Sequence, residues 1–380
     1  MNDITNSKLL DKVTGCLYGG AIGDALGAPA EWRMPPEIRA RYGYITDLVE
    51  SWDGPSDIGK GDGRYTDDSH MVQVLSRIYL EAGDHLDAFQ FAKGVIPLIA
   101  QEPRWVPEFG RDMLLVERLF YPEKWLYMRL CLANADPRQG GVGNMVNCGA
   151  AMYAAPVGIV NAGDPTQAYR EAVDVFSAHQ QSYGLEAAAV MAACVAEAFR
   201  PGASVESVID TALTLSKEGT HRAIAAVVDT AKQHHDWKAA IGPLREAIRP
   251  YDGSAELNTM RGNGTNNWQP SREHSIEEVP VALGFLIVTG GDFEGSIFGS
   301  ANYGRDNDSI AGMAGSIAGA LHGAQVIRKN WMEQIDRANR VDLTATAARL
   351  AELIVKLQRQ QFAQAQAREA AMSALLSALS

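Results

Sequence analysis

Apolar residues recur at helical spacing along most of this 380-residue chain, and this pattern limits its possible folds more than any other feature. Stripes with steps of three to five residues run through six segments: 8–28, 69–82, 184–199, 205–216, 222–234 and 309–328. Alternating apolar and polar residues, which are typical of strands, are scarce. The apolar run at 281–288 is interpreted as a buried helix, because helical patterns dominate the rest. The sequence therefore predicts an all-α fold.

The C-terminal segment 343–379 is rich in Ala, Leu and Gln and contains neither Gly nor Pro, which predicts one long helix or two. Its apolar stripe needs a partner surface. We expect that surface to be the body of the chain, with a second copy of the chain as the alternative. The stripe consists of Leu350, Leu353, Ile354 and Leu357.

The chain contains no segment typical of an interdomain linker. We therefore expect a single domain over 1–342 and a helical extension over 343–380. Two segments rich in Gly or polar residues, 33–65 and 250–275, are expected to be irregular, and long irregular loops are often functional.

Composition excludes several function classes. The net charge is −12, from 34 basic and 46 acidic residues, which argues against a nucleic-acid partner. An acidic excess is compatible with cation binding, although solubility is its commoner cause. The N-terminus lacks the pattern of a signal peptide, and no apolar stretch reaches the roughly 18 residues of a membrane span. The four cysteines are scattered and lack C-x-x-C spacing, so we expect reduced, mostly buried thiols in the cytoplasm: Cys16, Cys131, Cys148 and Cys194.

Three acidic clusters stand where helices are expected to begin or end. The first, at 19–31, is rich in Gly and Ala and contains Asp24; Pro29 ends its helix near Ala28, so Glu31 follows on roughly the same side. The second is R-Y-T-D-D-S-H at 64–70, and the third is Y-G-R-D-N-D-S at 303–309. Helix capping explains one or two acidic residues in each cluster.

Capping does not readily explain several acidic residues together, because adjacent carboxylates repel unless a cation lies between them. Oxygen-only ligands suit Mg²⁺, Mn²⁺ or Ca²⁺. Converging helices could therefore assemble two divalent ions from these side chains: Glu31, Thr66, Asp67, Asp68, Asp306, Asp308 and Ser309.

In this order, the clusters resemble the motifs of the ADP-ribosylglycohydrolase family. The matching segments are G-D-A-L-G-A-P-A-E at 23–31, T-D-D-S at 66–69 and D-N-D-S at 306–309. The resemblance implies an orthogonal all-α bundle with two Mg²⁺ or Mn²⁺ ions. It implies metal ligands at Thr66, Asp67, Asp68, Asp306, Asp308 and Ser309. It also implies a catalytic glutamate at Glu31, and a residue that positions this region at Asp24.

Two further segments resemble parts of the family that approach the substrate. The segment 143–158 is similar to its glycine-rich loop, which implies substrate contacts at Gly143, Asn144, Gly149, Ala150 and Tyr153. The segment 177–184 resembles its histidine-bearing segment and implies a role for His179, for which a packing role has equal weight. The chain departs from the family's motifs at Asn147, Tyr153 and Arg305, and Arg305, like Tyr153, is expected to contact the substrate. Residues 101–140 are unusually rich in aromatics.

The resemblance implies cleavage of a ribosyl C1–N or C1–O bond, which breaks through an oxocarbenium-like state. Glu31 is the candidate acid/base, with Asp67 or Asp308 holding a water. The expected substrate is a small-molecule or protein-linked ADP-ribosyl group. The departures motivate one alternative, hydrolysis of a smaller nucleoside-like riboside. A sensor that binds ADP-ribose without turnover is the alternative from another class, and the intact metal ligands argue against it.

Overall fold

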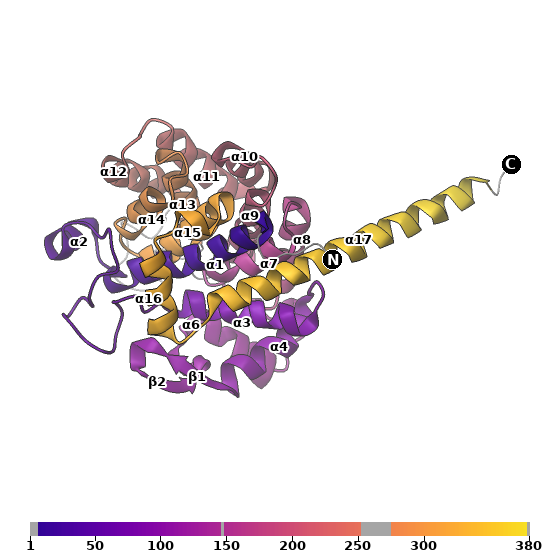
Figure 1. Cartoon of the computed structure of the whole chain (residues 1–380), viewed down its shortest axis with the longest axis horizontal. Helices are drawn as coiled ribbons and strands as arrows, with labels where there is room; N and C mark the ends of the chain where they lie inside the picture. Colours follow the sequence, from indigo (N-terminus) through magenta and orange to yellow (C-terminus); the bar gives the residue numbers. More distant parts are fainter. Residues whose placement is uncertain (1–6, 146–147, 252–274, 378–380) are drawn as a thin grey trace.

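The computed structural model describes residues 7–145, 148–251 and 275–377. They form an assembly of helices (Figure 1), which confirms the all-α prediction. One short antiparallel hairpin, β1 (Pro103–Val106) and β2 (Arg111–Leu114), is the exception in this part of the chain. Each strand has four residues, which is too short for an alternating pattern to be recognised in the sequence.

At the centre of the fold, α1 (Lys8–Gly27) and α15 (Asn307–His322) pack against each other in antiparallel directions. Three helices surround α15: α9 (Ser182–Ala198), α13 (Glu278–Val288) and α14 (Phe293–Ala301). The run at 281–288 lies within α13, so its prediction as a buried helix is confirmed.

The remaining helices of the body complete the shell around this core. They are α2 (Pro35–Tyr42), α3 (Asp67–Ala82), α4 (Ala88–Ala100), α5 (Leu115–Arg118), α6 (Tyr121–Leu126), α7 (Ala155–Val160), α8 (Pro165–Phe176), α10 (Val205–Leu215), α11 (Glu218–Ala231), α12 (Trp237–Ile248) and α16 (Lys329–Asn339).

The two segments expected to be irregular have different outcomes. Helix α2 lies within 33–65, so the prediction of irregular structure was wrong there. Its first residue is Pro35, and proline is favoured at the first position of a helix because it lacks an N–H that would have no partner. Within 250–275, residues 252–274 lie outside the described part of the chain.

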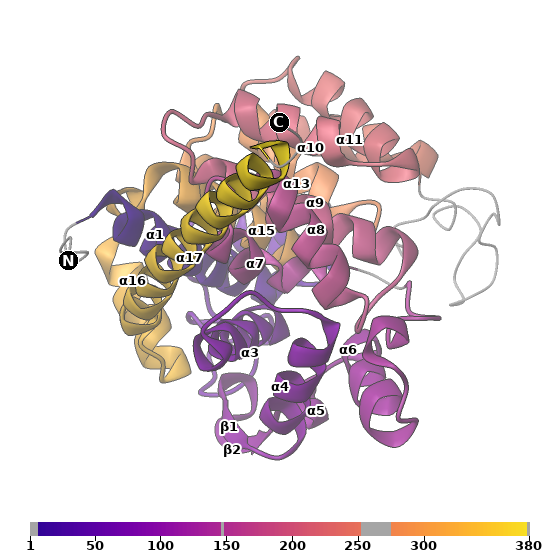
Figure 2. The ribbon, with the colours of Figure 1, turned by 90° about the vertical axis from the view of Figure 1, so that its right-hand side faces the viewer.

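The C-terminal segment is one helix, α17 (Leu343–Ser377). Its first half packs on α1, α3 and α7, and the stripe that includes Leu350 and Leu357 is buried, which confirms the body of the chain as its partner. Beyond Gln361, the helix projects away from the body (Figures 1 and 2). The side chains of residues 362–376 are exposed. No helix in the described ranges combines the length and apolarity that crossing a bilayer requires.

Candidate active site

Close packing of α1 on α15 brings the first and third acidic clusters together. A Cβ atom at Gly19 would collide with the backbone of Gly315, and a Cβ at Gly27 would collide with the backbone of Asp308. Glycine at these positions allows the two backbones to touch. The end of α1 therefore lies directly against the beginning of α15, where Asp308 stands in the first turn.

Asp24 joins the second cluster to this pair. Its carboxylate accepts hydrogen bonds from the backbone N–H of Thr66 at 2.9 Å, the backbone N–H of Ser69 at 3.1 Å and the Ser69 hydroxyl at 2.6 Å. Burial and the charge of Asp308 raise the pKa of Asp24 to about 7, although these hydrogen bonds oppose the shift. The geometry makes Asp24 an anchor for the N-terminus of α3.

The acidic residues brought together in this way include oxygens that have no hydrogen-bond partner. Asp68 Oδ2 and Asp308 Oδ1 are buried and unpartnered, and both residues are at most 5% exposed. Burial, together with Asp308 and other carboxylates, raises the pKa of Asp68 well above its usual range. Burial and Asp308 raise the pKa of Asp306 to about 8. Such a cluster is unfavourable when ionised unless a cation is present.

Glu31 lies next to the third cluster because two backbone hydrogen bonds join the segment that follows Glu31 to the segment that contains Arg305. Trp32 N–H donates to the carbonyl of Arg305 at 2.7 Å, and Arg305 N–H donates to the carbonyl of Arg33 at 2.8 Å. One oxygen each from Glu31, Asp306 and Asp308 lies within 4.8 Å of the others. This set of hard oxygen donors fits a divalent ion such as Mg²⁺ or Mn²⁺.

Two basic side chains that sequence analysis missed contact the acidic cluster. Lys60 forms an ion pair with Glu31. Arg118 Nη1 lies 2.6 Å from Asp67 Oδ1, and the same guanidinium binds both carboxylate oxygens of Glu108. Burial raises the pKa of Asp67, and the charge of Arg118 opposes that shift. No motif marked these residues, because their pairing depends on segments distant in sequence that the fold brings together.

The predicted substrate residues of the glycine-rich segment belong to a buried network of hydrogen bonds. Asn144 Nδ2 donates to the carbonyls of Pro122 at 2.9 Å and His179 at 2.8 Å. The N–H of Ala150 donates to Gln180 at 2.8 Å, and the flanking residues Gly143 and Gly149 belong to the same loop.

His179 and Tyr153 are fully buried and contact each other. His179 Nε2 donates to the carbonyl of Pro122 at 3.0 Å, so its Nδ1 accepts a hydrogen bond from the Tyr153 hydroxyl at 2.7 Å. Burial lowers the pKa of His179 to about 3, which keeps the ring neutral. Both side chains therefore hold the loop against α6.

The remaining predicted residues lie at the third cluster. Arg305 has a positive φ of 61° and its guanidinium contacts the Glu277 carboxylate at 3.2 Å. Ser309 is buried in the first turn of α15, where its hydroxyl hydrogen-bonds Asp306. Asn147 lies outside the described residues.

Glu123 in α6 is a further residue that sequence analysis missed. It is 1% exposed, and neither carboxyl oxygen has a hydrogen-bond partner. Burial, followed by the charge of Asp67, raises its pKa well above the usual range. Its segment, P-E-K-W, contains nothing that distinguishes it from an exposed glutamate on a helix surface.

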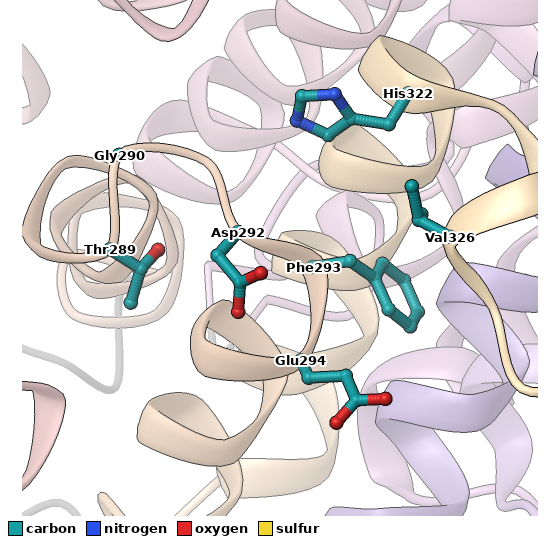
Figure 3. Close-up of a pocket in the computed structure, with 7 residues that line it drawn as sticks. All are labelled: Thr289, Gly290, Asp292, Phe293, Glu294, His322 and Val326. Carbon is teal, nitrogen blue, oxygen red and sulfur yellow. The ribbon is translucent and has the colours of Figure 1, made fainter.

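The opposite end of α15 has a hollow that differs from this cluster (Figure 3). His322 Nε2 donates to the carbonyl of Gly291 at 2.9 Å, and Asp292 accepts from the N–H of Gly295 at 2.7 Å. Glu294 is paired with Arg328. Because these polar groups have partners within the protein, the hollow is a weaker candidate for a site.

Comparisons with known proteins agree with the geometry. A family model described as ADP-ribosylglycohydrolase matches residues 5–361. ADP-ribosylhydrolase ARH3 of Bos taurus is 23% identical over 357 residues, which cover 89% of this chain and 92% of that protein. ADP-ribosylarginine hydrolase Tri1 of Pseudomonas putida (strain GB-1) is 24% identical over 333 residues, which cover 87% of this chain and 76% of that protein.

Among solved structures, a chain of an ADP-ribosylglycohydrolase-related protein complex has a similar fold. Its TM-score is 0.62 at 18% identity, and the match covers 91% of this chain and 99% of that chain. The motifs, the fold and the family match along nearly the whole chain lead to one conclusion: the chain belongs to the ADP-ribosylglycohydrolase family of hydrolases.

Proposed function

We propose that this chain is a divalent-metal-dependent glycohydrolase that cleaves the ribosyl bond of an ADP-ribosyl group. The observation that carries the proposal is the buried carboxylate cluster, in which Asp68 Oδ2 and Asp308 Oδ1 have no partner beside Asp306. A protein retains such an unfavourable arrangement where a ligand completes it. Membership of the family supplies the reaction class.

In this proposal the site holds two ions, Mg²⁺ or Mn²⁺, and the group of oxygen donors from Glu31, Asp306 and Asp308 supports it. Those that would hold the ions, as the family resemblance implies, are Thr66, Asp67, Asp68, Asp306, Asp308 and Ser309. When bound, divalent ions offset the carboxylate charge, orient the ribose hydroxyls and lower the pKa of a water. Their chemistry suits a reaction in which positive charge develops on the sugar.

Glu31 is the acid/base in this proposal. Its position beside Asp306 and Asp308 supports the role, and Lys60 holds its carboxylate in an ion pair. Asp67 or Asp308 holds the attacking water. Arg118 fixes the Asp67 carboxylate, because it is itself held at two points by Glu108.

The substrate is an ADP-ribosyl group on arginine or another acceptor. The names of the relatives support this choice, since one is an ADP-ribosylarginine hydrolase. In the proposal, Asp24 and Arg305 shape the metal side of the substrate site. The glycine-rich loop approaches the ribose and phosphates with Gly143, Asn144, Gly149 and Ala150. Tyr153 and His179 support this loop through their hydrogen bonds to each other and to Pro122.

A smaller N-riboside is the second candidate substrate, and one observation favours it. Tyr153 replaces an arginine that is common in the family, and its side chain is fully buried. It therefore offers no charge to a diphosphate.

The free cysteines of the described chain, three of them buried, are typical of a reducing compartment, and a cytoplasmic location is part of the proposal.

The test is a hydrolysis panel with Mg²⁺ present, comparing ADP-ribosyl-arginine with simple ribosides. Asp306→Ala is the inactive control. Release of ADP-ribose by the parent chain but not by this variant supports the proposal. Release of ribose from small ribosides alone supports the second candidate. Binding of ADP-ribose without turnover of any substrate supports the sensor. Glu31→Gln must lose turnover while still binding substrate, otherwise Glu31 is not the acid/base.

A further inference from the structure

Cys148 lies in the glycine-rich loop and contacts the acidic cluster directly. Its thiol is 1% exposed and donates a hydrogen bond to Asp306 Oδ2, with a sulfur–oxygen distance of 3.3 Å. A hydrogen bond also links the thiol to Ser309. Both residues are predicted metal ligands. Ser309 lies in the first turn of α15, and Asp306 directly precedes that helix.

The sulfur belongs to a second group of possible metal donors. One donor atom each from Cys148, Glu278 and Asp306 lies within 4.8 Å of the others. Asp306 is also a member of the group formed with Glu31 and Asp308. Its carboxylate therefore links the thiol to the oxygen cluster, and both groups belong to one continuous centre.

A separate observation indicates that a cation belongs beside this thiol. Asp68, a predicted ligand of the same centre, is 5% exposed, and its Oδ2 has no partner. A divalent ion relieves the repulsion among these buried carboxylates.

We propose that Cys148 is a sulfur donor of the metal centre, and that it gives this centre a second mode of binding reserved for thiophilic ions. The identity of the centre rests on the proposed function. In this mode, the S–H bond breaks, a metal–sulfur bond forms and one proton leaves for the solvent. Thiolates favour Zn²⁺, Co²⁺ and Cd²⁺, whereas Mg²⁺ is held by oxygens alone. Cys148 therefore determines which metals the centre selects.

The experiment is a titration of the metal-free chain with Co²⁺, followed by absorbance. Sulfur coordination produces a sulfur-to-cobalt charge-transfer band in the near ultraviolet. The parent chain is expected to show the band, and Cys148→Ser to lose it while still binding Co²⁺. Cys194→Ser, at a buried cysteine remote from the cluster, and Cys131→Ser, at an exposed one, are the matched controls and should keep it.

Calorimetry supplies a second readout with Cd²⁺ and Mg²⁺. The Cd²⁺ affinity of Cys148→Ser is expected to fall by at least about tenfold, since loss of even an outer-shell partner costs roughly that much. The Mg²⁺ affinity should change little. The parent chain should release one more proton per Cd²⁺ bound than the variant. The charge-transfer band, measured on the parent chain alone, tests the proposal even where a variant does not fold.

Two results would overturn the proposal: Co²⁺ binding by the parent chain without the band, or a band that survives in Cys148→Ser. Neither depends on turnover. A band without hydrolysis of any riboside refutes the proposed function and leaves the sulfur donor standing. Hydrolysis without the band refutes the sulfur donor and leaves the proposed function standing.

Discussion

The two ends of α15 carry similar kinds of residues but differ in how those residues are satisfied. At its N-terminus, Asp306 and Asp308 join buried carboxylates that include unpartnered oxygens. At its C-terminus, His322 and its neighbours line an open hollow in which the polar groups have partners (Figure 3). The difference teaches that a ligand site is marked by unsatisfied buried groups rather than by the presence of a hollow.

The cause of the difference lies in the packing around the helix. The positive end of the helix dipole favours carboxylates at the first turn of α15 and likewise at α3. Glycines on α1 then bring these two helix ends together around Asp24. At the other end of α15, Arg328 lies close enough to neutralise Glu294.

The largest expected effect separates the two ends by activity. Asp308→Ala should reduce hydrolysis of ADP-ribosyl-arginine on the order of a thousandfold, because metal sites supply several kcal/mol of transition-state stabilisation. Glu294→Gln at the hollow is the matched control and should keep the parent rate. Equal loss of activity in both variants would place the site elsewhere. Steady-state rates at saturating Mg²⁺ provide the measurement.

The next effect concerns the packing that forms the N-terminal site. Gly315→Ala should reduce the free energy of unfolding by about 3 kcal/mol, because the added methyl group collides with the backbone of Gly19. Gly242→Ala in α12 is the control, since a Cβ there meets no atom within 4 Å. It should stabilise the chain by roughly 0.5 kcal/mol. Urea denaturation measures both, and a neutral Gly315→Ala would refute the close contact.

Metal removal and pH should act together on the N-terminal site. The folded metal-free chain holds the pKa of Asp24 at about 7 and that of Asp306 at about 8, against 3.8 for an ordinary aspartate. At pH values between 3.8 and about 8, these two carboxyls hold more protons in the folded state than in the unfolded state. The free energy of unfolding of the metal-free chain therefore falls as pH rises through this window. EDTA should therefore lower Tm more at pH 9 than at pH 6. A larger loss at pH 6 would contradict this assignment, and calorimetric scans in both buffers decide it.

The smallest effect is expected at the free half of α17. The side chains of residues 362–376 are exposed, so removal of residues 362–380 should leave Tm and activity unchanged. The stripe around Leu350 is buried on the body, so a second copy could pair only through this exposed half, which carries Phe362 and Leu375. If two copies pair through this half, light scattering should show the mass fall from a dimer to a monomer. An unchanged mass would remove that hypothesis.

The sequence by itself determined the helices and the composition of the acidic clusters. Periodicity and capping are local, so α13, α17 and the junctions at Thr66 and Asp306 could be predicted from neighbouring residues. The short hairpin and α2 were missed because their segments carry little periodic pattern.

Only the tertiary structure decided which side chains complete the site. Lys60, Arg118 and Glu123 carry no motif, yet they lie at or near the cluster because a loop, α5 and α6 fold over it. Cys148 contacts Asp306 across 158 residues of chain. Charges interact through space, whereas sequence patterns extend over only a few turns. The unsatisfied oxygens that define the site therefore emerge only when α1, α3 and α15 meet.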